Sequence, residues 1–334
     1  MEPFEHVDAP SAPGAVRLLQ PAPDGAGAAR PIAGGTDLLT TLKAGLHAPY
    51  RLVNLKSIRG LDGVEAGAEG LRIGALVTLD TIERHPVIRE RYRALADAAG
   101  LAASPQLRNM GTLGGNLAQE TRCWYYRNPE IPCWLKGGQT CYAREGENSH
   151  HAIFTDRSYC VSVHPSDPAT ALLALGATII VQTAEGERRL PIGEYFTPPR
   201  DDRRRLNALG PADVITAVEL PPAPAGSASL YLKAMDRAAW SFALASVAVA
   251  LTWAGGGPGR VVATARVAVG GVAPIPLRAT AAESYLTGKP IDAATAAEAG
   301  RLAVQSAAPL AHNIYKTRLL SGLLAAALTD LAAG

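Results

Sequence analysis

The chain has 334 residues, of which 48% are hydrophobic and 19% charged, so it is long enough for two or three packed domains and too apolar to be disordered. Its 32 basic and 30 acidic side chains leave a formal charge of +2 without a block of like charges, so nucleic acid is not expected as a partner. The first residues lack a basic segment followed by an apolar one, so we expect no secretory signal and a cytoplasmic location.

Apolar periodicity predicts alternating short elements without an internal repeat. The first are a helix over 11–20, a strand running into a turn over 29–35, a helix over 36–46 and a strand over 50–55, which make a compact opening unit. The next are a strand over 70–76, a helical stretch over 78–99 that Pro86 breaks, a helix over 166–176 capped by Ser166 or Asp167, and strands over 178–183 and 213–221.

A proline-rich joint at 220–229 is the predicted domain boundary. Beyond it, strands are predicted over 231–235, 243–253 and 261–272, followed by three alanine-rich helices. Strands followed by helices indicate a separate α+β domain. The stretch 238–259 has no charged residue and could cross a bilayer as a helix, but its β-branched residues in near alternation and its closing GGGPG predict a buried strand and a turn.

Two glycine pairs stand at predicted turns: Gly34 and Gly35 precede a helix, and Gly114 and Gly115 follow Thr112. Glycine lets backbone N–H groups approach a ligand closely, and successive N–H groups in a turn form a concavity that holds an anion. Each loop could therefore cradle a phosphate, although strand-to-helix turns also contain glycine for local reasons. Neither loop is GxGxxG or a P-loop, so a nicotinamide or ATP site is not expected.

Several segments in order resemble the flavin subunit of the xanthine dehydrogenase family of molybdenum hydroxylases. They are PIAGGTDLL, RNMGTLGGNLA, HPSDPATALLAL, DVITAVELP, YLKAMDRAAWSFALASVAVAL and GGVAPIPLR, and the resemblance covers nearly the whole chain. It implies an α+β fold: a PCMH-type FAD-binding domain in two subdomains over 1–224, and a C-terminal α/β sandwich of an antiparallel sheet with helices over 225–334, like the CO dehydrogenase flavoprotein.

By the same resemblance, the two glycine loops hold the FAD diphosphate and ribityl region. The residues expected to line the FAD site are Ile32, Ala33, Gly34, Gly35, Thr36, Asp37, Leu38, Thr112, Gly114, Gly115, Asn116, Asp167, Ile215 and Lys233. Alternatives stay open for three of them. Asp167 could simply cap its helix and Ile215 could be a core residue, while Lys233 could either stabilise the reduced flavin or extend to the surface.

All four cysteines lie within residues 117–166, with the spacing C-x9-C-x7-C-x18-C. Disulfides are disfavoured because no export signal is present and a chain of this size can be held by its core. Structural zinc usually takes closely spaced cysteine pairs, and no CxxC occurs here. A 4Fe-4S cluster needs four thiolates and can gather them from a longer loop, but spacing alone does not decide between cluster and zinc.

The resemblance bears on this choice, since typical flavin subunits run almost directly from the second glycine loop to the SDPA-type helix. A minority carry an insert with a 4Fe-4S cluster, and this chain looks closer to the aldehyde oxidoreductase type than to the 4-hydroxybenzoyl-CoA reductase type. The implied ligands are Cys123, Cys133, Cys141 and Cys160. Trp124, Trp134 and Tyr142 each follow a cysteine and could exclude water from the cluster or form the core of the insert. His150, His151 and His164 are interpreted as ordinary polar residues.

The resemblance implies an electron-transfer subunit with FAD and one 4Fe-4S cluster, without catalytic residues of its own. Its expected partners are a 2Fe-2S subunit and a large molybdenum subunit that oxidises the substrate, with an external electron carrier as a further candidate. Aldehyde, N-heterocycle and aromatic thioester substrates all stay open. A partner with a twin-arginine signal would move the complex to the periplasm. The alternatives are a self-contained flavin oxidase and a zinc-stapled binding module.

Overall fold

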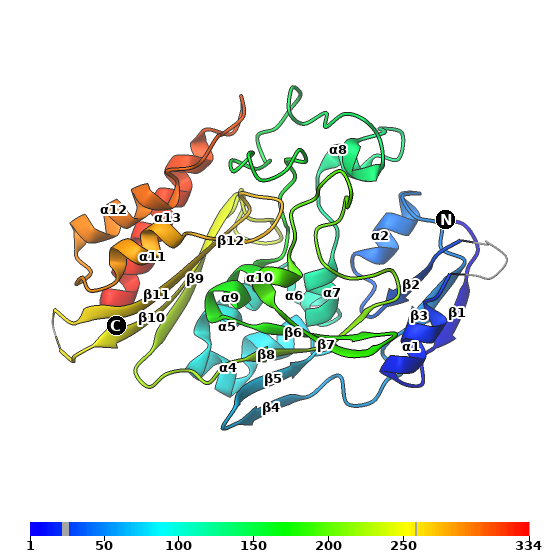
Figure 1. Ribbon diagram of the computed structural model, residues 1–334, viewed down its shortest axis with the longest axis horizontal. Coiled ribbons are helices and arrows are strands. Elements are labelled where there is room, and N and C mark those ends of the chain that lie inside the picture. Colours follow the sequence, from blue (N-terminus) through cyan, green and yellow to red (C-terminus); the bar gives the residue numbers. More distant parts are fainter. Residues whose placement is uncertain (22–26, 258, 334) are drawn as a thin grey trace.

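Three sheets form the framework of the computed structural model, which describes residues 1–21, 27–257 and 259–333. The first sheet has three strands, the second five and the third four. The first and third lie at opposite ends of the molecule, with the second between them (Figure 1). The expected mixture of helices and largely antiparallel sheets is therefore present.

The first sheet is parallel, with β3 between β1 and β2. Its elements are β1 (Glu5–Asp8), α1 (Ala12–Leu18), β2 (Ala29–Ile32), α2 (Leu38–Lys43) and β3 (Arg51–Asn54). Parallel neighbours need crossover connections, and the two helices lie in those connections. The predicted order of helix, strand, helix and strand is confirmed, whereas β1 was missed because its residues are mostly exposed and lack an apolar pattern.

The second sheet has the order β4-β5-β8-β6-β7 and is antiparallel throughout. Its strands are β4 (Val64–Gly67), β5 (Gly70–Gly74), β6 (Thr178–Thr183), β7 (Gly186–Pro191) and β8 (Val214–Leu220). The accompanying helices are α3 (Leu79–Arg84), α4 (Pro86–Arg91), α5 (Arg93–Gly100), α6 (Pro105–Arg108), α7 (Leu113–Ala118), α9 (Asp167–Leu175) and α10 (Ile192–Tyr195). The predicted break at Pro86 is confirmed, since α4 starts there.

The third sheet is an antiparallel meander in the order β12-β11-β10-β9. Its elements are β9 (Ala228–Ala234), β10 (Ala245–Ala254), β11 (Val261–Gly270), β12 (Leu277–Arg278), α11 (Thr280–Leu286), α12 (Ala293–Ala303) and α13 (Tyr315–Ala333). Val247 and Val249 pack with α11, α12 and α13, whereas Ala248 packs with α5 and α9 on the other face. Alternate residues of β10 are thus buried on both sides, which explains its nearly continuous apolar run.

The predicted strand in the uncharged stretch is therefore confirmed as β10. Pro258, in the predicted GGGPG turn, lies outside the described residues. No helix in the described ranges combines the length and the apolar character needed to cross a membrane. The joint predicted at 220–229 connects β8 to β9, and the domain limits at 224 and 225 stay a prediction.

The segment from the end of α7 to the start of α9, which we call the cysteine insert (117–166), is largely irregular. It contains α8 (Trp124–Arg127) and a single 3-10 turn, η1 (Trp134–Lys136). It lies at one edge of the molecule, drawn in green at the top of Figure 1. Backbone N–H groups of Ile153 and Phe154 donate to Val272 O, and Lys316 of α13 donates to the carbonyl of His150, so the insert is fastened to the C-terminal part.

Candidate functional site

A pocket of about 550 Å³ opens between the first sheet, α7 and the start of α9. Pockets for small molecules typically measure roughly 300–1,000 Å³. All fourteen residues predicted to line the FAD site lie around this one pocket: Ile32, Ala33, Gly34, Gly35, Thr36, Asp37, Leu38, Thr112, Gly114, Gly115, Asn116, Asp167, Ile215 and Lys233. The fold therefore brings together segments far apart in the sequence, and the contact of each residue with FAD stays a prediction.

The loop between β2 and α2 has the features of an anion cradle. From Ala33 to Leu38, the backbone N–H groups donate no hydrogen bond to another described residue. Gly35 has φ +70°, a conformation that favours glycine. Successive unpaired N–H groups that line a pocket offer donors to an anion, so this loop fits a diphosphate.

The second glycine loop differs, because Gly114 and Gly115, which were expected in a turn, form the first turn of α7 and the chain itself uses their N–H groups. Leu113 N donates to Val77 O, Gly114 N to Ala75 O, and Gly115 N to the Thr112 hydroxyl. Thr112 is thereby the N-cap of α7. This loop lines the pocket but supplies fewer free backbone donors than the first one.

The two glycine loops touch each other, and Gly34 makes that contact possible. A Cβ atom at Gly34 would lie 1.9 Å from the carbonyl oxygen of Met110, which is far inside van der Waals contact. Close approach of two backbones is one of the specific uses of glycine. The glycine at 34 is therefore explained by the packing of one loop on the other, independently of any ligand.

Asp167 and Lys233 form a buried ion pair beside the pocket. Lys233 Nζ lies 2.7 Å from Asp167 Oδ2 and 3.0 Å from the carbonyl oxygen of Leu101, and the Tyr231 hydroxyl lies 2.5 Å from Asp167 Oδ1. Burial raises the pKa of Asp167, and the Lys233 ammonium opposes that rise. The side chain of Lys233 is only 1% exposed, so the alternative in which it extends to the surface is wrong.

The helix-capping alternative for Asp167 is also answered by the geometry. Ser166 is the N-cap of α9, and its hydroxyl accepts a hydrogen bond from Ala169 N at 3.0 Å. The same hydroxyl lies 2.5 Å from Asn116 Oδ1. Ile215 belongs to the hydrophobic core and also lines the pocket, so its core role is confirmed and its contact with the flavin stays a prediction.

Asp37 joins the first glycine loop to the cysteine insert. Its Oδ1 atom lies 2.9 Å from Arg122 Nη1 and 2.8 Å from Arg127 Nη2, and its Oδ2 accepts a hydrogen bond from Glu120 N at 2.9 Å. Burial lowers the pKa of Arg122 to about 10, although the Asp37 charge opposes this. The negative charge of Asp37 is thus balanced by two guanidinium groups, so it would not repel an anion bound in the adjacent loop.

Glu120 and Arg122 line the pocket too, and sequence reasoning missed both. Burial would raise the pKa of Glu120, but hydrogen bonding to His47 and the charges of His47 and Arg30 outweigh it and lower the pKa to about 2. Arg122 directly precedes Cys123. The pocket and the cysteines therefore share one short stretch of chain, residues 120–127.

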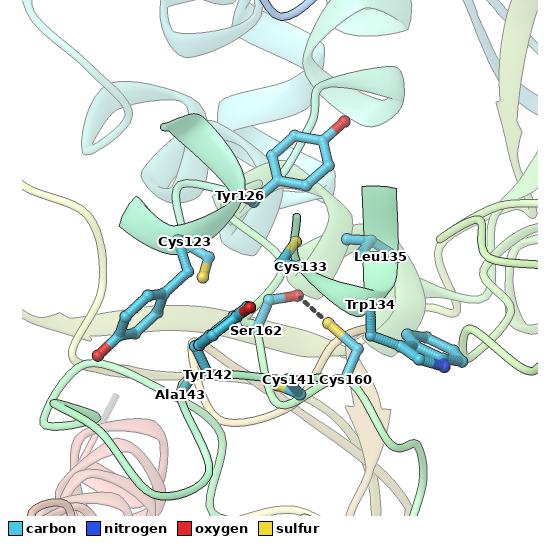
Figure 2. A pocket seen from close by; sticks show the side chains of 11 residues that line it. Cys123, Tyr126, Cys133, Trp134, Leu135, Cys141, Tyr142, Ala143, Cys160 and Ser162 are labelled. Atoms are coloured by element: carbon cyan, nitrogen blue, oxygen red, sulfur yellow. Dashed lines mark hydrogen bonds between the residues drawn. The ribbon is translucent and has the colours of Figure 1, made fainter. Parts of the chain in front are cut away.

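A second, smaller cavity is lined by all four cysteines (Figure 2). Cys123, Cys133, Cys141 and Cys160 are all free thiols, and none forms a disulfide. Burial raises the pKa of Cys123 to about 11 and that of Cys160 to about 12. The fold thus assembles four thiols from a span of 38 residues around one space of about 10 Å³.

The residues next to the cysteines take different positions. Trp134 and Tyr142 line the cavity, as does Ser162, whose hydroxyl lies 3.3 Å from Cys160 Sγ. Trp124 instead packs edge-on against His151, with 4.8 Å between ring centroids. Among the described residues, no three His, Cys, Asp or Glu side chains are arranged to hold one metal ion.

The three histidines that were interpreted as ordinary polar residues differ in burial and in the groups they contact. His151 is buried, and its Nε2 atom lies 3.2 Å from Cys123 Sγ. His164 packs against Phe196, and burial lowers its pKa to about 3. His150 is half exposed. Nothing in the sequence distinguished His151, because its contact with Cys123 spans 28 positions of irregular chain.

Comparison with known protein families gives two matches that divide the chain. The model described as FAD binding domain in molybdopterin dehydrogenase matches residues 3–223. The model described as CO dehydrogenase flavoprotein C-terminal domain matches residues 230–331.

Individual relatives agree with these matches. The aldehyde oxidoreductase FAD-binding subunit PaoB of Escherichia coli K12 is 38% identical over 302 residues, 90% of this chain and 90% of that protein. The nicotinate dehydrogenase FAD-subunit of Eubacterium barkeri is 27% identical over 260 residues, 78% of this chain and 72% of that protein. Among solved structures, a carbon monoxide dehydrogenase chain from Hydrogenophaga pseudoflava has a TM-score of 0.77 at 26% identity, covering 100% of this chain and 99% of that one.

The first family model spans well over half of the chain, and the identity to PaoB extends over nearly all of it. Both agree with the pocket that unites the two glycine loops. The chain therefore belongs to the molybdenum hydroxylase family, as an FAD-binding medium subunit of its oxidoreductase complexes.

Proposed function

We propose that this chain carries FAD and one 4Fe-4S cluster and passes electrons within a heterotrimeric molybdenum hydroxylase. The favoured substrate of that complex is an aldehyde. The observation that carries the proposal is the arrangement of four free thiols around one cavity, beside a pocket that both glycine loops line. Glu120 and Arg122 line the larger pocket and Cys123 lines the smaller cavity, so two redox centres bound there would be neighbours. No residue of this chain is assigned a catalytic role.

FAD fits the larger pocket in its donors. The free N–H groups from Ala33 to Leu38 would hold the diphosphate of FAD. The ribityl region beside it would be lined by Thr112, Gly114, Gly115 and Asn116. The Asp167 carboxylate would meet the polar part of the flavin, and Lys233 would keep that carboxylate charged. Ile215 would supply an apolar wall. Bound flavin exchanges either two electrons or one, which is the chemistry that such a subunit needs.

The donors around the smaller cavity suit a 4Fe-4S cluster in number and type. Each iron takes one thiolate, and four thiols are available there. Because ligands bind metal as thiolates, loading would release the protons that burial holds on Cys123 and Cys160. Zinc is the competing occupant by donor type, since a structural zinc site also takes four thiolates, although the described side chains are not arranged to hold a single ion.

The proposed partners are a 2Fe-2S subunit and a large molybdenum subunit, which would bind the organic substrate, together with an external electron carrier. An aldehyde is favoured because PaoB, at 38% identity, is named as an aldehyde oxidoreductase subunit. The nicotinate dehydrogenase subunit, at 27%, represents the N-heterocycle alternative. We also propose an FAD-binding domain over 1–224 with the insert at 117–166, a C-terminal domain over 225–334, and a cytoplasmic location unless a partner carries an export signal.

The visible spectrum and metal content of anaerobically purified protein test this proposal. We expect flavin bands, a broad iron-sulfur shoulder and about four irons per chain without zinc. A colourless protein containing zinc would refute the redox function and support a zinc-stapled module. Co-purification with the two partner subunits separates the complex from a self-contained flavin oxidase, which would be isolated alone with its own activity.

A further inference from the structure

We infer that His151 is a positioning residue that donates a hydrogen bond to the sulfur of Cys123 and that, together with Ser162 at Cys160, it raises the reduction potential of the proposed cluster. The inference rests on the proposed 4Fe-4S centre and concerns residues outside its ligand set. Four cysteines complete that set, so the histidine is left to act on a ligand rather than on iron.

The geometry at His151 suits a hydrogen bond to sulfur. Its Nε2 atom lies 3.2 Å from Cys123 Sγ, and the residue is only 2% exposed. Trp124 meets the ring edge-on at an interplanar angle of 85°. The His151 carbonyl accepts a hydrogen bond from Asn313 Nδ2 at 3.2 Å, which fastens the backbone to the C-terminal part of the molecule.

The thiolate state of Cys123 decides which ring nitrogen of His151 carries the proton. His151 Nδ1 is buried and has no hydrogen-bond partner among the residues that the structure describes. A thiolate bound to iron can only accept, so the Nε2 atom must donate if the 3.2 Å contact is kept. The neutral tautomer protonated at Nε2 meets this requirement and leaves Nδ1 as a lone pair.

Ser162 stands in the same relation to another ligand. Ser162 is 2% exposed as a residue, its hydroxyl lies 3.3 Å from Cys160 Sγ, and Figure 2 shows the hydroxyl directed at that sulfur. Once Cys160 has lost its proton, the hydroxyl can rotate to donate. No side-chain hydrogen bond reaches the sulfur of Cys133 or Cys141 within the described part of the chain. The two donors therefore act on two of the four ligands.

The direction of the effect follows from charge. Reduction adds one electron to the cluster and its sulfurs, and an N–H or O–H dipole directed at a sulfur stabilises the more negative state. Hydrogen bonds to the sulfurs are among the features that set the potentials of such clusters. Removing either donor should therefore make the cluster harder to reduce.

The test substitutes His151 by Phe, which preserves the ring packing on Trp124 and removes the donor. The full chain, purified anaerobically with its partners, is titrated with dithionite and redox mediators while the electron paramagnetic resonance signal of the reduced cluster is followed. We expect iron and FAD contents to match those of the wild type. The ratio of reduced to oxidised cluster at a fixed potential should fall about tenfold, which is a negative shift of about 59 mV for one electron.

Three comparisons sharpen the result. His151→Gln, whose amide can donate, should restore part of the shift, and Ser162→Ala should shift the potential in the same direction. His150→Phe is the matched control, because His150 is half exposed and its nearest ionic contact is Asp236 at 3.9 Å. The reduction potential of the cluster should not change in this variant.

Each outcome decides a separate question. An unchanged potential in His151→Phe with full iron content would overturn the inference. Loss of about one iron in the same variant would also overturn it, since it would make His151 a ligand. Absence of iron from the wild type would instead refute the proposed function, so the two failures are distinguishable. If His151→Phe does not fold, His151→Gln and Ser162→Ala still report the shift.

Discussion

At the scale of single residues, the orientation of a side chain was harder to predict than its location. Asp37 was expected in the flavin site and does line the pocket, but its carboxylate faces Arg122 and Arg127. Its partner Arg127 lies 90 positions away in a segment without a regular pattern, so no local signal could reveal the contact. Lys233 was likewise located by resemblance, and its buried partner Asp167 emerged only from the fold.

Substitution of Asp37 by Asn should loosen the cysteine insert. The change keeps the shape of the side chain but leaves two guanidinium groups without a full charge partner, at a cost of about 1–2 kcal/mol because these groups are partly exposed. Thermal unfolding of the anaerobic protein checks this. Asp80→Asn is the control, since its partner Arg84 is 73% exposed and should contribute little. Equal melting temperatures for the two variants would contradict the prediction.

Substitution of Lys233 by Met should destabilise the protein in a pH-dependent manner. Burial already raises the pKa of Asp167 above its ordinary 3.8, and loss of the ammonium raises it further. A carboxyl whose folded pKa is raised costs stability as pH rises from its unfolded pKa to its folded one. The deficit of the variant should therefore grow from about pH 5 to neutral pH, toward roughly 3 kcal/mol.

Unfolding curves of the Lys233→Met variant and the wild type, measured at both pH values, check this dependence. Lys56→Met, at an exposed position, provides the comparison for loss of a lysine as such. A deficit that is constant with pH would show that Lys233 acts through packing and not through the charge of Asp167.

At the scale of elements, periodicity predicted most strands and helices, and the contacts between loops escaped it. The apolar runs of β6 and β10 were sufficient, because each strand contains a continuous buried run, Ile179 to Val181 in β6 and Ala245 to Val249 in β10. The first glycine pair correctly marked a loop, whereas Gly114 and Gly115 lie in the first turn of α7 and not in a loop. Which N–H groups stay free also depended on neighbouring segments. Those of Leu113 and Gly114 are taken by Val77 and Ala75, which the sequence could not indicate.

Substitution of Gly34 by Ala should separate the two glycine loops and weaken FAD binding. The new methyl group would meet the Met110 carbonyl at 1.9 Å, and a backbone atom cannot move aside cheaply. We expect a loss of stability of about 1–3 kcal/mol and flavin below one equivalent, measured from the absorbance of purified protein. Gly63→Ala is the control, since nothing lies within 4 Å of its added carbon atom. Full flavin occupancy in Gly34→Ala would contradict this explanation.

At the scale of the whole molecule, the cysteine insert lies between the pocket and the C-terminal part. Arg122 and Glu120 border the pocket, whereas Asn313 and Lys316 hold the other end of the insert through its backbone carbonyls. The presence of an insert was implied by the resemblance, from the length of chain between the second glycine loop and the SDPA-type helix. Its attachment was not, because Lys316 lies on the last helix and nothing in that helix signals a buried lysine.

Changing Cys123, Cys133, Cys141 or Cys160 to Ser should remove iron and leave FAD largely bound. The free N–H groups of the first glycine loop lie outside the cysteine cavity, so the main anion site should survive loss of the cluster. Iron and flavin are quantified on the same sample, with Ser149→Ala, at a half-buried position in a turn of the insert, as the control. Loss of flavin before iron would show that the insert is an integral part of the FAD pocket.

The hydrogen bond between the Ser166 hydroxyl and Asn116 has an evolutionary consequence. These residues stand at the two ends of the insert, and their side chains meet at 2.5 Å. A segment whose ends already touch can be added or deleted as one block while the elements on either side keep their positions. The reason is that the entropic cost of closing a surface loop rises only slowly with the length of the loop. One ancestral gene could thus have yielded descendants with and without the four thiols, through a single insertion or excision at that point.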